Sequence, residues 1–205
     1  MTGETNTPRP ATAAPTGGLF ALPVDQFLER VAAREPAPGG GAVAGATVAA
    51  AAGLVAMAAR FSEGDTAAAA DRADALRQHA CALAEEDGSR YAAVLAAYQL
   101  PRDPAGPRRE RIVAALADAT DIPLALVECA RDVGTLGVAV AAGGNPNLRG
   151  DAITAVLLAD AAGRSAAHLV RCNVDLGQLP GDPVERSQAW CDELGLAVRA
   201  VEGRA

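Results

Sequence analysis

Aromatic residues are scarce in this chain of 205 residues, where phenylalanine, tyrosine and tryptophan together make up 3%. Half of the residues are nevertheless hydrophobic, and alanine is the most frequent of them. Alanine favours helices and lets them pack closely, but it buries little apolar area, which stabilises a fold by roughly 25 cal/mol per Å². We therefore expect a helical protein that gains further burial by forming a homodimer.

Basic charge is also in short supply, because the formal net charge is −7. Nucleic acids and anionic membranes both require a basic face, so neither is expected as a partner. A short basic run at Arg108, Arg109 and Arg111 is interpreted as the solvated start of a helix.

Cysteine and histidine are few and widely spaced along the chain. The four cysteines form no CxxC pair, which predicts reduced thiols in a reducing compartment. The two histidines, His79 and His168, belong to no known ligand spacing, so no protein-bound metal is expected.

The N-terminus lacks a basic segment followed by an apolar run, so the sequence predicts a cytoplasmic protein without a signal peptide. Residues 42–59 carry no charge and are nearly long enough to span a bilayer, but alanine and glycine contribute little to membrane insertion. We expect a buried helix here instead. Small residues recur every four positions and predict close contact with another helix, at Gly41, Gly45, Ala49 and Gly53.

The chain has the length of one domain, and we divide it into a flexible tail at 1–21 and a single helical domain at 22–205. Proline- and glycine-rich turns are expected at 36–41, 62–65, 100–107, 121–123, 143–147 and 179–183. No alternating β-branched run is present. The sequence thus predicts an all-α bundle of six or seven helices around a central Ala/Gly-rich helix.

A carboxylate interrupts the apolar stripe of the long segment 66–98. Spacings of three and four place Asp87 on one face with leucine, alanine, valine and tyrosine side chains, among them Tyr91. A carboxylate on such a face is costly to bury unless it is paired, and its pKa is expected to be perturbed. Asp87 is therefore either a structural partner for a neighbouring helix end or arginine, or a functional group.

Asp151 begins a second stripe of this kind, which ends at Asn173. Near a helix N-terminus, Asp151 also has a structural explanation, because the helix dipole favours negative charge there. Twenty-two residues of straight helix span about 33 Å, so both residues cannot serve one small ligand in the same protomer. Asn173 is thus structural, or it belongs to a different and inter-subunit region.

The glycines that follow Pro38 directly precede the Ala/Gly-rich helix. Unpaired backbone N–H groups gather at such a helix start and form a small cradle for negative charge. A glycine turn that only packs tightly is the alternative explanation.

Five segments together resemble one known family, in the same order along residues 23–173: FLERVAAREPAPGGGAVAGA, DGSRYAAVLAAYQLPR, RRERIVAALADATDIPL, GNPNLRGDA and RCNV. They are similar to the C-terminal domain of formiminotransferase-cyclodeaminases and to the related methenyltetrahydrofolate cyclohydrolases. The resemblance implies an all-helical homodimer that acts on a tetrahydrofolate derivative, with no tightly bound cofactor.

The resemblance also implies a set of site residues. Asp87 and Asp151 would be the catalytic carboxylates, with Arg102 at the glutamate tail of the folate. Tyr91, one turn after Asp87, either contacts the substrate, by stacking on the pterin or hydrogen-bonding the carboxylate, or packs in the core. The remaining residues implied to bind substrate are Pro38, Gly39, Gly40, Gly41, Asn145, Asn147 and Asn173.

Four positions depart from the family pattern: Ala42 and Gly150 replace serines, Arg102 replaces a lysine and Gly177 replaces an asparagine. A lost hydrogen-bonding group in a site costs ~1 to 3 kcal/mol. Two alternatives therefore stand beside folate chemistry. The chain could close or open a C–N ring on a non-folate substrate, or it could be a non-catalytic scaffold of the same fold.

Overall fold

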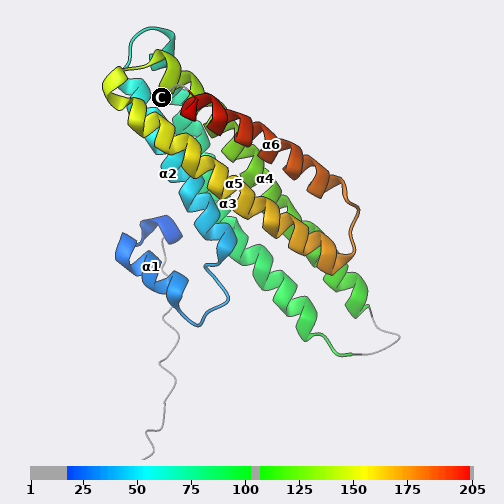
Figure 1. The fold of residues 1–205 in the computed structure, drawn as a ribbon. Helices are drawn as coiled ribbons and strands as arrows, with labels where there is room; N and C mark the ends of the chain where they lie inside the picture. Colours follow the sequence, from blue (N-terminus) through cyan, green and yellow to red (C-terminus); the bar gives the residue numbers. More distant parts are fainter. Residues whose placement is uncertain (1–17, 103–106, 204–205) are drawn as a thin grey trace, which may run out of the picture.

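The computed structural model describes residues 18–102 and 107–203. Six α-helices are present in these residues, with two short 3₁₀ helices and no strand, so the all-α prediction is confirmed (Figure 1). The α-helices are α1 (Val24–Ala32), α2 (Gly40–Arg60), α3 (Asp65–Gln99), α4 (Arg108–Gly143), α5 (Arg149–Gly177) and α6 (Asp182–Glu202). The 3₁₀ helices are η1 (Leu19–Ala21) and η2 (Pro146–Leu148).

The Ala/Gly-rich helix α2 lies at the centre of the bundle, packed against α3, α4 and α5. A β-carbon at Gly45 would lie 2.7 Å from the β-carbon of Ala84, so the α2 and α3 backbones approach too closely there for any larger residue. This contact confirms the helix contact predicted from the small residues. By length and apolarity alone, α2 and the segment Pro146–Gly177 could each cross a membrane, but most of α2 is buried inside the bundle.

Helix α4 runs without a break through Pro123, so the turn predicted at 121–123 is wrong. Proline lacks an N–H group, which leaves the carbonyl of Ala119, four residues earlier, without its helical partner. The side-chain Nδ2 of Asn173 on α5 donates a hydrogen bond of 3.0 Å to that carbonyl. A neighbouring helix therefore satisfies the backbone group that a proline inside a helix leaves unpaired.

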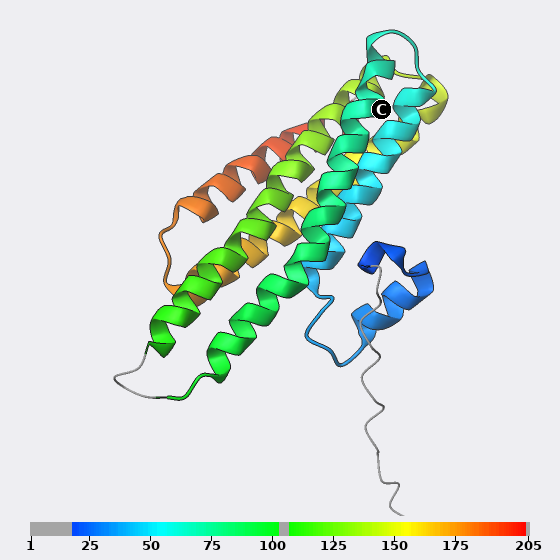
Figure 2. The same ribbon diagram turned by 180° about the vertical axis from the view of Figure 1, so that it is seen from behind.

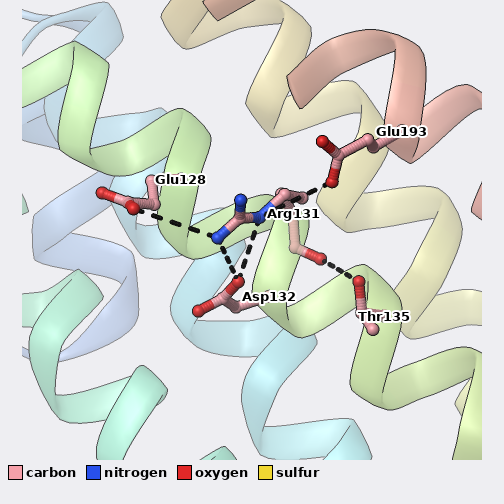
Figure 3. Close-up of polar contacts among 5 residues, drawn as sticks. All are labelled: Glu128, Arg131, Asp132, Thr135 and Glu193. Atoms are coloured by element: carbon pink, nitrogen blue, oxygen red, sulfur yellow. Dashed lines mark hydrogen bonds and ion pairs between the residues drawn. The ribbon is translucent and has the colours of Figure 1, made fainter. Parts of the chain in front are cut away.

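A cation–ring contact between Arg131 on α4 and Trp190 on α6 attaches α6 to the bundle, in addition to apolar packing. Arg186, the second cation on that ring, belongs to α6 itself. The ring of Trp190 lies 5.5 Å from the Arg131 guanidinium and 5.1 Å from that of Arg186. Figure 3 shows Arg131 on α4 between the carboxylates of Asp132 on its own helix and Glu193 on α6. The contacts of Arg131 with Glu193 and Trp190 fix α6 against α4.

Helix α1 lies beside the bundle near the start of α2 (Figures 1 and 2). Residues 1–17 of the predicted tail lie outside the described residues. The tail's last residues form η1, where the Phe20 N–H donates to Oε1 of Glu85 on α3 at 3.1 Å. Apolar side chains of α1 are exposed, among them Val24 and Leu28.

Candidate functional site

A cavity of about 340 Å³ lies where α2 begins. Its volume is within the usual range of small-molecule sites. Residues from four helices and from the α1–α2 connection line it: Pro36, Gly39, Gly40, Gly41, Asp87, Arg90, Tyr91, Ala119, Pro123, Leu169, Cys172, Asn173 and Leu176. Of the residues expected to form the site, Gly39 to Gly41, Asp87, Tyr91 and Asn173 are thus brought together in one protomer.

Asp87 is the half-buried carboxylate of this cavity. Burial raises its pKa, and a hydrogen bond from the Ala42 backbone N–H partly opposes that rise. Ala42 lies in the first turn of α2, so Asp87 on α3 caps the N-terminus of α2. The expected perturbation of the pKa is confirmed, and the structural explanation of Asp87 is also correct. A helix cap and a reactive carboxylate are compatible roles because an ionised carboxylate has several acceptor positions.

Gly41 makes room for this carboxylate. A β-carbon at position 41 would overlap with the Asp87 side chain, and no other described heavy atom is nearer to it. The space at Gly40 is less restricted, since a β-carbon there would be 3.7 Å from Leu169. The glycine run therefore combines two functions, a helix start with unpaired N–H groups and a close approach of α2 to Asp87.

Ala119, Pro123 and Asn173 form the part of the cavity wall that α4 and α5 contribute together. Because its Nδ2 is hydrogen-bonded to the Ala119 carbonyl, Asn173 holds α5 against α4. Its side-chain oxygen is the atom left to meet a ligand.

Asp87 and Arg90 are the two charged residues that line the cavity. Arg90, one turn after Asp87, donates from Nε to Oε1 of Glu86 at 2.9 Å. This bond raises the pKa of Arg90 above its usual value, and the negative charges of Asp118 and Asp121 on α4 add to the rise. Because Arg90 is paired with Glu86, the carboxylate of Asp87 is the lining charge that is left to attract a cationic group of a ligand.

The other expected site residues lie elsewhere in this protomer. Pro38 is buried next to the cavity without lining it, and Arg102 lies beyond the end of α3. From Asp87 to Gln99, α3 rises about 18 Å. Asn145, Asn147 and Asp151 are at the opposite end of α2, which is about 30 Å long.

Asn145 is fully engaged in local structure at that opposite end. Its Nδ2 donates to the Phe61 carbonyl at the end of α2, at 3.0 Å. Its Oδ1 accepts from the Asn147 backbone N–H, also at 3.0 Å, and so caps η2. Asn147 is exposed and Asp151 lies in the first turn of α5, where the helix dipole favours it.

Sequence reasoning missed several residues that line the cavity, chiefly Arg90, Cys172, Ala119 and Pro123. Arg90 lies three residues after Asp87, a spacing that places both on one helix face and could have indicated it. Cys172 adjoins Asn173 and follows His168 by four residues, a spacing that places the two side chains on one helix face and could have indicated it. Among the described residues, no group of three or more histidine, cysteine, aspartate or glutamate side chains is placed to hold a metal ion.

The structure is an all-α bundle with a cavity of small-molecule size at the start of its central helix, and Asp87 lines that cavity. Residues 23–178 match the formiminotransferase-cyclodeaminase family, and the chain belongs to that family.

Two comparisons with individual proteins agree with this assignment. The chain is 35% identical over 162 residues to a methenyltetrahydrofolate cyclohydrolase of Methylorubrum extorquens, covering 73% of this chain and 78% of that protein. Its fold is similar to the crystal structure of a formiminotetrahydrofolate cyclodeaminase from Thermotoga maritima, with a TM-score of 0.78 and 23% identity. That match covers 91% of this chain and 98% of the other.

Proposed function

We propose that this protein is a tetrahydrofolate one-carbon enzyme that hydrolyses methenyltetrahydrofolate or cyclodeaminates formiminotetrahydrofolate. The observation that carries the proposal is Asp87, a half-buried carboxylate of raised pKa in a cavity at the start of α2. The names of the relative and of the structural neighbour supply the substrate class.

Asp87 suits the proton transfers that hydrolysis of a methenyl group requires. The one-carbon unit is a cationic carbon between two nitrogens, so water must attack it and a proton must reach one nitrogen as the C–N bond breaks. A carboxylate with a raised pKa accepts the water proton and returns it to the leaving nitrogen. A positioned acid–base group of this kind contributes about 10² to 10⁴-fold to the rate.

The surroundings of Asp87 support the binding of a cation. Arg90 is paired with Glu86, and the ionised form of Asp87 attracts the methenyl group directly. Tyr91 lies one turn from Asp87 and lines the same cavity, where its ring would stack on the pterin. The N–H groups of Gly40 and Gly41 precede the first bonds within α2 and would contact pterin oxygens.

Arg102 is the proposed contact of the glutamate tail, because α3 extends beyond the cavity and ends just before this residue. A folate bound with its pterin at Asp87 would extend its tail along α3 toward the tip of the hairpin that α3 and α4 form.

We further propose that Asn145, Asn147 and Asp151 serve the cavity of a second copy of the chain. They are about 30 Å from Asp87 along α2, too far to share its ligand within one protomer. An antiparallel homodimer would place the start of α5 of each copy at the start of α2 of the other. Asp151 would then face the partner's Asp87 across the bound folate, and each cavity would be complete only in the dimer.

The first test is the loss of methenyltetrahydrofolate absorbance with purified protein, corrected for the spontaneous reaction. Asp87→Asn should lower kcat by about 10² to 10⁴-fold while the helical circular dichroism stays unchanged. Full activity in that variant would refute the role of Asp87. A folded protein with no activity on either folate would favour a non-folate C–N substrate or a scaffold.

Mixing two inactive variants tests the shared site. If each cavity combines Asp87 of one chain with Asp151 of the other, a mixed dimer of Asp87→Asn and Asp151→Asn chains contains one intact site. Random re-association would restore about a quarter of the wild-type activity, because half of the dimers are mixed and each has one working site of two. If the chains are shown to exchange and no activity returns on mixing, the shared site is wrong. Either both carboxylates then act in the same protomer, or Asp151 has no role in the reaction.

A further inference from the structure

Cys172 differs from the other three cysteines in what surrounds it. All four are free thiols, but Cys129 and Cys191 are buried and only Cys172 lines the cavity. Burial raises the pKa of Cys81 and Cys191, and it raises the pKa of Cys129 to about 12. The thiolate is the reactive form of cysteine, so a raised pKa lowers the reactive fraction of these three thiols.

A base is in contact with the Cys172 thiol. Nε2 of His168, one turn earlier on α5, lies 3.5 Å from Sγ of Cys172. In the tautomer with its proton on Nδ1, the exposed imidazole accepts a proton through Nε2. A cysteine with an adjacent histidine is the arrangement that activates a thiol as a nucleophile.

Charge around this pair is favourable to an anionic reagent. His168 lines a polar groove of about 210 Å³ between α5 and α6, together with Arg164 and Arg171. Asp160 is paired with Arg164 through a bond of 2.9 Å, whereas no carboxylate of the described residues is paired with Arg171. His168 lines this groove and Cys172 lines the cavity, so the pair connects the two. Cys191 also lines the groove, but its side chain is buried.

We propose that the Cys172–His168 pair is a covalent modification site, at which the thiol exchanges with anionic low-molecular-weight disulfides. His168 takes the proton of the thiol, and the thiolate attacks one sulfur of the disulfide. The disulfide bond of the reagent breaks as the new bond to Cys172 forms, and the departing thiolate regains the proton from His168. The Cys172 sulfur is oxidised, the released thiol is the reduced product, and a second thiol reverses the reaction.

The mixed disulfide would fill the cavity from the α5 side. Cys172 shares that cavity with Asp87 and adjoins Asn173, so the added group lies where the substrate is proposed to bind. Loss of turnover on modification rests on the proposed function, whereas the modification itself does not. The site would make the enzyme sensitive to the thiol–disulfide balance of its compartment.

The experiment is to treat the full chain with oxidised glutathione and to follow the adduct by intact mass and peptide mapping. One adduct per chain is expected, mapped to Cys172, removed by a thiol reductant and absent from Cys172→Ser. His168→Gln should slow the modification about tenfold, since the thiol then lacks its base. Cys81→Ser is the matched control and should be modified, and should turn over substrate, like the wild type.

An adduct mapped to Cys81, or equal rates for His168→Gln and wild type, would overturn the proposal. Hydrogen exchange of the Gly40–Val43 amides reports cavity filling without any reliance on activity and should slow in the adduct; unchanged exchange would refute occlusion. If unmodified protein turns over neither folate, the proposed function fails while the mapped adduct still stands. If turnover exists and the adduct leaves it unchanged, occlusion is wrong.

Discussion

Similar residue types lie near the two ends of α2, but they have different surroundings. At its start, glycines, Asp87 and Asn173 surround a cavity, and burial perturbs the carboxylate. At its end, Asn145 has both ends of its side chain bonded to the backbone. A cavity of about 340 Å³ is also present near that end, but its lining, which includes Thr66 and Leu136, contains neither Asn145 nor Asp151. Polar groups whose hydrogen bonds are all made within the protein stabilise the fold. A partly buried carboxylate that lines a cavity can instead contact a ligand and exchange a proton with it.

The largest expected effect comes from filling the space that Asp87 occupies. Gly41→Ala would force the carboxylate out of place, which should cost about 1 to 3 kcal/mol of unfolding free energy and most of the proposed turnover. Gly53→Ala is the matched control in the same helix. A β-carbon there would be 3.7 Å from Arg77, so it should gain up to about 1 kcal/mol of helix propensity. Denaturant unfolding and the folate assay would check both, and equal behaviour of the two variants would remove the distinction between the two halves of α2.

The next largest effect concerns the wall of the cavity. Asn173→Ala leaves the Ala119 carbonyl without a partner and should cost about 1 to 3 kcal/mol. In a Pro123→Ala background residue 123 has an N–H group for that carbonyl, so the same change should cost less than about 1 kcal/mol. A double-mutant cycle by denaturant unfolding measures this coupling. Additive costs would show that Asn173 does not compensate for the proline.

Pro123 also marks what the sequence could and could not predict. The helical fold, the central α2 and the perturbed carboxylate all followed from the spacing of apolar residues along single helices. The continuity of α4 did not, because it depends on Asn173, fifty residues away in sequence, donating to a carbonyl on another helix. Prediction from neighbouring residues places a helix break at a proline. It contains no information about a hydrogen bond from another helix that satisfies the unpaired carbonyl.

The site was predictable in part for the same reason. Asp87 was found because it interrupts an apolar stripe, and the glycines because they precede a helix. The family resemblance assigned Asn145, Asn147 and Asp151 to the same site as Asp87 and the glycines. A resemblance of sequence does not say whether all of these residues come from one chain of a dimer. The lengths of α2 and α5 separate the two sets in one protomer.

At the far end of α2, a smaller effect is expected for Asn145→Ala. Its two hydrogen bonds are exposed, so water replaces much of what is lost, and the cost should be about 0.5 to 1.5 kcal/mol. Asn147→Ala, whose side chain is exposed at the same end, is the control and should change stability by less than about 0.5 kcal/mol. Thermal unfolding would show whether Asn145 is structural; a change as small as that of the control would leave it free for the ligand of a second copy.

The smallest net effect is expected for the stability of Asp87→Asn, because opposing terms offset each other. Asparagine removes the burial cost of the charge, yet it accepts only a weaker bond from the Ala42 N–H. The pH dependence nevertheless has a definite sign. A folded-state pKa above 3.8 means that the native protein retains a proton that the unfolded chain has released. The stabilisation that comes from this retained proton is fully present at low pH, and it is lost as the pH rises through the folded-state pKa of Asp87.

Asp87→Asn cannot ionise, so its melting temperature relative to wild type should rise between about pH 3 and pH 7. Gly53→Ala is the control for this series, since its offset from wild type involves no titrating group and should not vary with pH. An Asp87→Asn offset that falls over the same range would mean that the bond from Ala42 outweighs burial. The carboxylate would then be an ordinary helix cap, and the start of α2 would resemble its end more than the cavity implies.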